Sequence, residues 1–147
     1  MEPDKKTFKK LERYAESVTS CQIAALNLAA WSENTKLSLD NSGNRNSNIA
    51  NNGKVIEVEA DSLDNITSGL PVDYVKYDVE GSEMQAILGS AAIIQRFAPE
   101  LCVSLYHRNE DIFLLPSLIH HLNPKYKLYL RRGTYLPAWD INLIAIK

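Results

Sequence analysis

Residues 72–83 read VDYVKYDVEGSE and predict a strand that runs into a glycine turn and then into the start of a helix. Asp78 and Glu80 close the strand, Gly81 supplies the turn, and Glu83 falls in the first helical turn, where the helix dipole favours a carboxylate. Open α/β sheets bind their ligands at the carboxyl ends of parallel strands. Carboxylates crowded at such an edge repel one another unless solvent, a cation or a polar substrate meets them. This stretch is therefore the first candidate for a functional site.

Strand and helix patterns alternate on the C-terminal side of this stretch. Apolar residues recur at helical spacing through residues 84–97 and predict one helix that ends before Pro99. Residues 101–105 form a continuous apolar strand with His107 just beyond its carboxyl end, and a second helix is predicted over residues 110–122. This alternation predicts a parallel sheet that is covered by helices on both faces.

The last two predicted strands differ in their exposure. Residues 126–131 alternate apolar with polar side chains, as expected of an edge strand, whereas residues 141–146 are nearly all apolar and should have neighbours on both sides. The segment between them is too short for a helical crossover, so the two strands should pair as an antiparallel hairpin. We therefore expect the final strand to lie between the edge strand and residues 101–105.

The N-terminal half also predicts helix and strand. Asp4 is a good N-cap for a first helix, and residues 21–31, CQIAALNLAAW, predict a buried strand. The two flanks of residues 35–60 alternate apolar with polar side chains, and the asparagine-rich segment 40–53 between them can bury almost nothing. We expect residues 35–60 to form an antiparallel β-ribbon with a long loop on the surface.

The composition limits the class of protein. The chain has 147 residues, 45% of them hydrophobic, which fits a single domain over residues 1–147. Its 16 basic and 18 acidic residues provide no basic field for nucleic acid, and no apolar run approaches the roughly 18 residues that span a bilayer. Cys21 and Cys102 lie in apolar runs without metal-binding spacing, so we expect two reduced core cysteines and a cytoplasmic location.

Several blocks of the sequence resemble the FkbM-type S-adenosylmethionine-dependent methyltransferases, which belong to the class I methyltransferases. The most specific block is residues 76–83, KYDVEGSE, which is similar to the family pattern KxDVEGxE. The similarity extends along the whole chain, in matching order, through Glu2-Pro3-Asp4 with Phe8 and Leu11, Ala29-Ala30-Trp31, Ser62-Leu63-Asp64, Tyr106-His107-Arg108 with Glu110-Asp111, Leu122-Asn123-Pro124 with residues 126–131, and Trp139 with Asn142-Leu143.

The resemblance also indicates what the sequence lacks. The family begins with a strand and a glycine-rich turn of the DxGxxxG type, whose backbone approaches the cofactor closely. This sequence has no GxG spacing anywhere, and it starts with a block that follows the second strand of the family. The resemblance therefore implies an α/β fold with a Rossmann-like class I methyltransferase sheet that lacks its first two strands and ends in an antiparallel hairpin. Unpaired strand edges should then cause low stability or self-association.

The activity implied by the resemblance is methyl transfer from S-adenosyl-L-methionine to a hydroxyl of a small-molecule acceptor, such as a sugar or a polyketide. Glu2 matches the family residue that binds the ribose hydroxyls, and Trp31 lies where the adenine ring is held. Asp78 lies beside the methionine moiety, where it would orient the nucleophile or act as base. His107 ends the neighbouring strand, about 4.8 Å away, so it could share that role with Asp78. Glu80 is a further candidate.

Each assignment has a structural alternative. Glu2 could be a mobile terminal residue, Trp31 a core residue, Asp78 a helix cap, and His107 a satisfied histidine at the sheet edge. A hard-cation site formed by the acidic side chains with His107 is conceivable, but we expect no metal. Two functional hypotheses remain: an O-methyltransferase whose substrate half is present here, or a noncatalytic remnant or interaction module that keeps the fold without binding cofactor.

Overall fold

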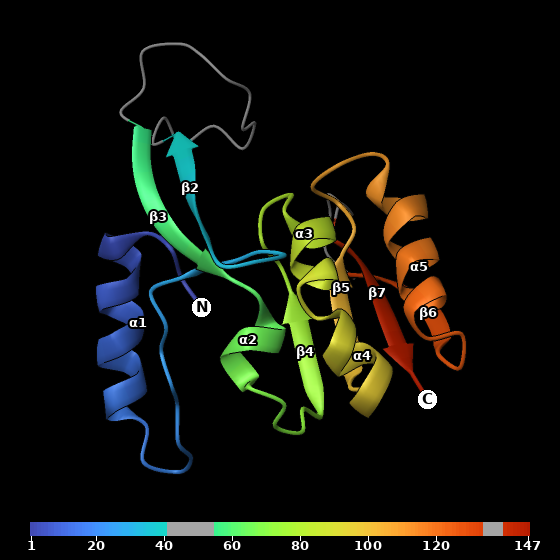
Figure 1. Ribbon diagram of the computed structural model, residues 1–147, viewed down its shortest axis with the longest axis horizontal. Helices are drawn as coiled ribbons and strands as arrows, with labels where there is room; N and C mark the ends of the chain where they lie inside the picture. The colour runs from blue at the N-terminus through green and yellow to red at the C-terminus, as the bar shows by residue number, and fades with distance from the viewer. Residues whose placement is uncertain (41–54, 134–139) are drawn as a thin grey trace.

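A four-stranded sheet forms the C-terminal half of the chain in the computed structural model, which describes residues 1–40, 55–133 and 140–147 (Figure 1). Its strands are β4 (Tyr74–Tyr77), β5 (Glu100–Ser104), β6 (Lys127–Arg132) and β7 (Ile141–Ile146), in the order β4-β5-β7-β6. β4 and β5 are parallel, whereas β7 is antiparallel to both of its neighbours. β7, the most apolar of these strands, thus lies inside the sheet between β5 and β6, as its sequence predicted.

Three helices cover one face of this sheet: α3 (Glu83–Leu88), α4 (Ala91–Phe97) and α5 (Asp111–Leu122). The apolar side chains between the helices and the strands form the main core, which contains Ile87, Ile94, Leu101, Val103, Leu115, Ile119, Leu143 and Ala145. The expectation of helices on both faces was wrong for the described residues. Successive right-handed crossovers that advance in one direction place their helices on the same face of a sheet.

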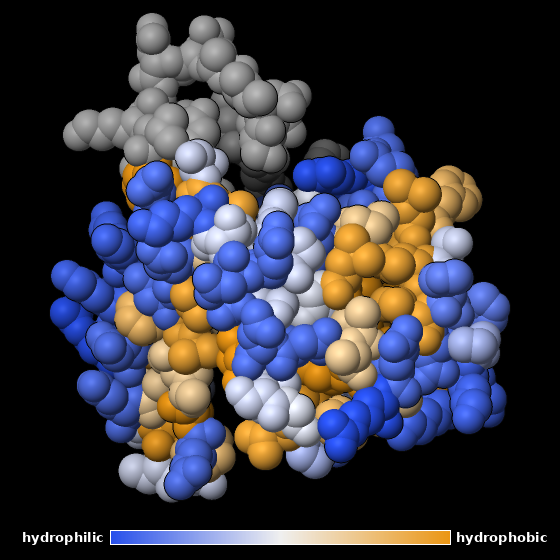
Figure 2. All heavy atoms as spheres, in the orientation of Figure 1, coloured by the Kyte–Doolittle hydropathy of each residue, from blue (hydrophilic) through white to orange (hydrophobic). Residues whose placement is uncertain are grey.

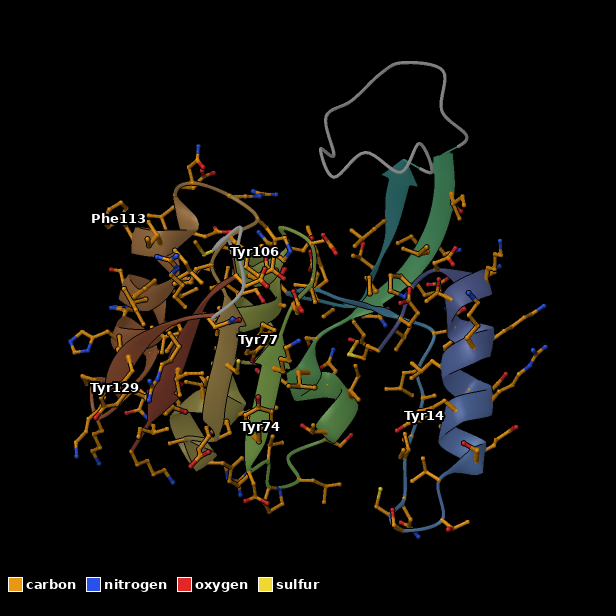
Figure 3. All side chains as sticks on the ribbon, turned by 180° about the vertical axis from the view of Figure 1, so that it is seen from behind. Tyr14, Tyr74, Tyr77, Tyr106, Phe113 and Tyr129 are labelled. Carbon is orange, nitrogen blue, oxygen red and sulfur yellow. The ribbon has the colours of Figure 1, made fainter. Side chains whose placement is uncertain are left out.

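The opposite face of the four-stranded sheet carries exposed aromatic side chains. Tyr74 is 56% exposed and Tyr129 is 46% exposed, and Figure 3, which views the molecule from behind, shows both on this face. Cys102 and Ile144 are half-buried and lie in one register row with Lys76 on β4 and Tyr129 on β6. This face is therefore the less covered one in the described part of the chain.

The single helix predicted over residues 84–97 is broken at Gly89, so that prediction was wrong. A Cβ atom on Gly89 would lie 2.0 Å from the carbonyl oxygen of Trp31, so the backbones approach too closely here for any side chain. The carboxylate of Asp64 then caps α4 by accepting hydrogen bonds from the amides of Ala92 and Ile93, at 2.9 and 3.0 Å. The break is set by contacts with the N-terminal half rather than by local propensity.

A second sheet contains β1 (Ala29–Ala30), β2 (Thr35–Asp40) and β3 (Val55–Asp61) in the order β1-β3-β2. β2 and β3 pair antiparallel along their length, which confirms the expected ribbon; Asp40 still belongs to β2, and residues 41–54 of the predicted loop lie outside the described residues. The first helix, α1 (Lys5–Ser17), begins as predicted after Asp4, whose side chain accepts a 2.7 Å hydrogen bond from the amide of Thr7. The short helix α2 (Leu63–Thr67) follows β3.

The predicted buried strand over residues 21–31 was mostly wrong. Only Ala29 and Ala30 are in a strand, where they pair parallel with Ala60 and Asp61 of β3. Residues 21–28 have no ladder partner in the described chain, and without one a strand cannot satisfy its backbone groups. Cys21 is consequently exposed and is not the core residue that we expected; both cysteines are free.

The two sheets do not share a strand pair within the described residues. On the face shown in Figure 2, apolar surface gathers over α3 and α5, where Leu88, Phe113 and Leu114 are exposed, and the surface of α1 is mostly hydrophilic. None of the helices in residues 1–40, 55–133 and 140–147 has the length and apolar character of a membrane span.

Candidate functional site

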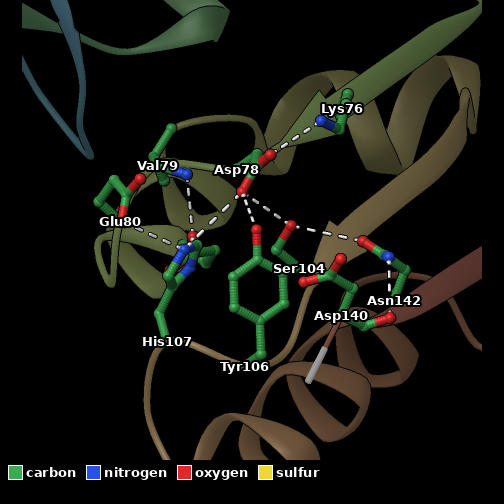
Figure 4. Close-up of polar contacts among 10 residues, drawn as sticks. Lys76, Asp78, Val79, Glu80, Ser104, Tyr106, His107, Asp140 and Asn142 are labelled. Carbon is green, nitrogen blue, oxygen red and sulfur yellow. Dashed lines mark hydrogen bonds and ion pairs between the residues drawn. The ribbon is translucent and has the colours of Figure 1, made fainter. Parts of the chain in front are cut away.

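The carboxyl ends of β4 and β5 meet at one edge of the four-stranded sheet. Asp78 follows β4 directly, and Tyr106 and His107 follow β5, its parallel neighbour. Figure 4 shows the side chains of Lys76, Ser104 and Tyr106 directed at the carboxylate of Asp78. Asp78 is therefore the centre of a polar cluster drawn from both strand ends.

Asp78 accepts three hydrogen bonds. Lys76 Nζ donates to Oδ2 at 2.8 Å, while Tyr106 Oη and Ser104 Oγ donate to Oδ1 at 2.8 and 3.0 Å. Burial raises the pKa of Asp78, but the hydrogen bonds from Lys76, Tyr106 and Ser104 together outweigh it and lower the pKa below its usual value of 3.8. The Asp78 side chain stays ionised and is 33% exposed, so it can meet a polar or cationic ligand.

The pKa values of Lys76 and Tyr106, the two ionisable donors, are raised, whereas that of Asp78 is lowered. The hydrogen bond to Asp78 raises the pKa of the Lys76 ammonium, which keeps it charged. Burial and then the bond to Asp78 raise the pKa of the Tyr106 hydroxyl, which keeps it neutral and able to donate. Ser104 Oγ also lies 3.4 Å from Oδ1 of Asn142 on β7, so the cluster reaches a third strand.

The turn after β4 has an unusual backbone. Glu80 has a φ of 54° and Gly81 a φ of 95°, and the amide of Ser82 closes the turn on the carbonyl of Val79 at 3.2 Å. A left-handed conformation costs a residue with a side chain roughly 1–2 kcal/mol, so its presence at Glu80 marks a turn held by its surroundings. A Cβ atom on Gly81 would also lie 3.3 Å from Nε of Arg108, which shows how closely the β5 loop approaches.

His107 lies across this turn and contacts all three acidic side chains of residues 78–83. Its Nδ1 atom is 2.7 Å from Oε1 of Glu83, and its Nε2 atom is 3.4 Å from Oε2 of Glu80 and 3.8 Å from Oδ1 of Asp78. The imidazole is only 6% exposed. Asp78 and His107 therefore converge as expected from neighbouring parallel strands, and Glu80 joins them; their roles in a reaction stay predictions.

The role of Glu83 in this cluster was missed by sequence reasoning. Glu83 does lie in the first turn of α3, but its side chain is fully buried, and Oε1 accepts a 2.9 Å hydrogen bond from the amide of Val79 as well as the contact with His107. Its other oxygen, Oε2, has no hydrogen-bond partner in the described residues. The signal that could have found this role was the crowding of three carboxylates within six residues.

Glu2 and Trp31 lie apart from this cluster, and no hydrogen bond or ion pair within the described part of the chain joins either residue to Asp78 or His107. Glu2 makes two hydrogen bonds: its amide donates to the carbonyl of Leu26 at 3.0 Å, and its Oε1 accepts from the amide of Asp4 at 2.8 Å. Trp31 packs against the small core under the second sheet. Their cofactor-binding roles stay predictions.

The described residues contain no group of three histidine, cysteine, aspartate or glutamate side chains that could hold a metal ion. The oxygens of Asp78 and the inner oxygen of Glu83 already accept hydrogen bonds from protein donors. The cluster is thus organised by internal hydrogen bonds and ion pairs.

Known proteins resemble this chain in sequence and in fold. The model of the methyltransferase FkbM domain matches residues 1–136. The crystal structure of methyltransferase FkbM from Methylobacillus flagellatus KT is similar in fold, with a TM-score of 0.78 over 99% of this chain and 24% sequence identity. The chain spans 35% of the length of that protein. No curated protein is similar enough to the chain to count as a match.

Proposed function

We propose, because this chain belongs to the FkbM methyltransferase family, that the cluster around Asp78 and His107 is the acceptor side of an S-adenosyl-L-methionine-dependent O-methylation site. The acceptor class that we propose is a hydroxyl of a small metabolite such as a sugar or a polyketide. The observation that carries the proposal is the convergence of Asp78 and the Nε2 atom of His107, 3.8 Å apart, at the ends of two parallel strands.

The side chains of this edge suit the charged end of the proposed cofactor. Its sulfonium and ammonium groups are cations, and the carboxylates of Asp78 and Glu80 lie at the strand end where they would meet them. When bound, the cofactor supplies a methyl group for in-line displacement by the acceptor oxygen. Positioning is then the main task of the protein residues.

His107 is the proposed proton acceptor. Its Nε2 atom is the ring nitrogen that faces Asp78 and Glu80, so it is the atom able to take the proton of the acceptor hydroxyl. Asp78 holds its charge by three hydrogen bonds and stabilises positive charge that develops on the imidazole. Glu80, at 3.4 Å from Nε2, contributes in the same sense.

Isothermal titration of the chain with S-adenosylhomocysteine tests this proposal. We expect binding in the micromolar range, weakened about tenfold or more by Asp78→Asn, since one such charged contact is worth about 1.4 kcal/mol or more. Glu57→Gln, which removes an exposed charge on β3, is the matched control and should leave the affinity unchanged. The absence of heat at millimolar ligand would overturn the proposal.

The second candidate function is a noncatalytic interaction module. It is favoured by one observation: none of the six glycines in the sequence stands in a GxG pattern, so the chain does not carry the glycine-rich turn that lets a backbone approach this cofactor. A chain of this kind would keep its fold and fail to bind S-adenosylhomocysteine at any accessible concentration. The same titration therefore separates the two functions.

A further inference from the structure

We infer that Glu83 is a positioning residue that fixes the tautomer and the orientation of His107. The inference deepens the proposed function and rests on it for its consequence, because a fixed ring is what would leave Nε2 ready to accept a proton at the site. The contact itself stands on geometry alone: Glu83 Oε1 and His107 Nδ1 are 2.7 Å apart, and both side chains are removed from solvent.

Two backbone features hold Glu83 in place. The amide of Val79 donates to Oε1 at 2.9 Å, which binds the carboxylate to the turn between β4 and α3. Side chains at the start of a helix point back toward its N-terminus, so Glu83 is directed over this turn and toward the end of the neighbouring strand β5. A fully buried carboxylate in such a setting has little rotamer freedom.

The hydrogen-bond donors decide the tautomer. As a carboxylate, Glu83 can only accept, so Oε1 accepts from the Val79 amide and from the imidazole, and the ring proton then lies on Nδ1. In the neutral ring, Nε2 then keeps its lone pair and faces Asp78 and Glu80. This is the arrangement in which a carboxylate orients a histidine base from its far side.

A second buried acid, Asp111, lies close enough to Glu83 to feel its charge. Asp111, at the first turn of α5, is buried and has an oxygen without a hydrogen-bond partner in the described residues. Burial and the negative charge of Glu83 raise the pKa of Asp111. Glu83, and not Asp111, is the buried acid that contacts the His107 ring.

Nitrogen-15 NMR of the histidine rings, recorded on the chain without ligand, tests the inference. Spectra are recorded at increasing pH until the two ring-nitrogen shifts of His107 show a single protonated nitrogen, and the tautomer is assigned there. The chain has three histidines, and the signals of His107 are the ones lost in His107→Gln. We expect the Nδ1–H tautomer, the less common one for an exposed histidine. A dominant Nε2–H tautomer would overturn the inference.

Two substitutions of Glu83 separate positioning from simple packing. Glu83→Gln keeps an oxygen that can accept from Val79 and from Nδ1, so the Nδ1–H tautomer should persist. Glu83→Met fills similar space without an acceptor, so His107 should shift toward the Nε2–H form. Glu80→Gln, on the other side of the ring, is the matched control and should retain the Nδ1–H form.

The role of Glu83 can still be tested if Glu83→Met does not fold. Should Glu83→Met not fold, the tautomer of the unaltered chain and its retention in Glu83→Gln still decide the inference. An Nδ1–H tautomer that persists in a folded Glu83→Met would contradict it. Because no cofactor is added, loss of S-adenosylhomocysteine binding would refute the proposed function and leave this measurement unaffected.

Discussion

Asp78 shows how one side chain can organise the end of a sheet. It receives donors from its own strand, through Lys76, and from the end of β5, through Ser104 and Tyr106. Hydrogen bonds to a charged acceptor contribute about 1.5–3 kcal/mol each when buried and less where solvent screens them. With a third of its side chain exposed, Asp78 should contribute a modest net amount to stability.

Asp78→Asn should lower the free energy of unfolding by about 1 kcal/mol at pH 7. The pKa of Asp78 is lower in the folded chain than its ordinary 3.8, so its contribution is fully present above pH 3.8 and is lost as the pH falls through the folded value. The difference between the two proteins should therefore shrink below pH 3.8. Urea unfolding at pH 7 and at pH 3 measures it.

The matched control for this prediction is Asp73→Asn, which alters an exposed aspartate at the other end of β4. It should change stability by less than about 0.5 kcal/mol at either pH. An equal loss of stability in both variants, or a loss in Asp78→Asn that is independent of pH, would contradict the assignment.

The residue scale also shows what a sequence can and cannot predict about a site. The approach of Asp78 and His107 follows from strand order, because neighbouring parallel strands end about 4.8 Å apart. The bond between Glu83 and His107 depends on the direction of a side chain at a helix start and on a turn with positive φ at Glu80. The spacing of apolar residues encodes neither feature. The sequence pattern therefore predicted that Glu83 interacts with the helix dipole, and it missed the contact of Glu83 with His107.

At the scale of elements, patterns that depend on local burial were informative. The strand over residues 141–146 was predicted with its neighbours, because its apolar composition and the short preceding connection allow one insertion point. Elements that depend on distant contacts were not predictable. Residues 21–28 read as a strand but have no described ladder partner, and the break at Gly89 is set by the carbonyl of Trp31.

Gly89→Ala should destabilise the chain by about 3 kcal/mol or more. The new Cβ atom would lie 2.0 Å from the carbonyl oxygen of Trp31, and a backbone atom cannot rotate away as a side chain can. Relief requires either α3 or the segment after β1 to move, which disturbs the cap of α4 by Asp64. Denaturant unfolding followed by circular dichroism gives the value.

Gly133→Ala provides the comparison for this prediction. A Cβ atom at Gly133 would meet its nearest neighbour at 3.7 Å, an ordinary contact, so the same substitution should cost less than about 0.5 kcal/mol there. A loss below about 1 kcal/mol in Gly89→Ala would show that the α3–α4 break can shift freely and is not fixed by Trp31.

At the scale of the whole molecule, the two sheets have separate strand edges. β4 has β5 as its only strand partner in the described residues. The amide of Glu100 donates to the carbonyl of Asp73, so the backbone groups of Asp73 point toward β5. Along a strand, the N–H and C=O groups of successive residues point to opposite edges, so those of Tyr74 and Lys76 point away from β5. An unpaired edge beside a face with exposed tyrosines is a template for a further strand. That the 147 residues act as one domain stays a prediction.

We therefore expect the chain to self-associate through the β4 edge, with a second copy as the partner. Sedimentation velocity from about 1 to 100 μM should show a species larger than the monomer, because a sheet edge offers unpaired amides and carbonyls together with apolar surface. Tyr74→Lys adds a charge at this edge and should weaken the association at least about tenfold. Tyr14→Lys makes the same change at a tyrosine that is 63% exposed on α1 and should have no effect. Figure 3 shows the two positions on different parts of the molecule. A monomer at every concentration that melts cooperatively, or equal weakening by both substitutions, would refute the β4 edge as the interface.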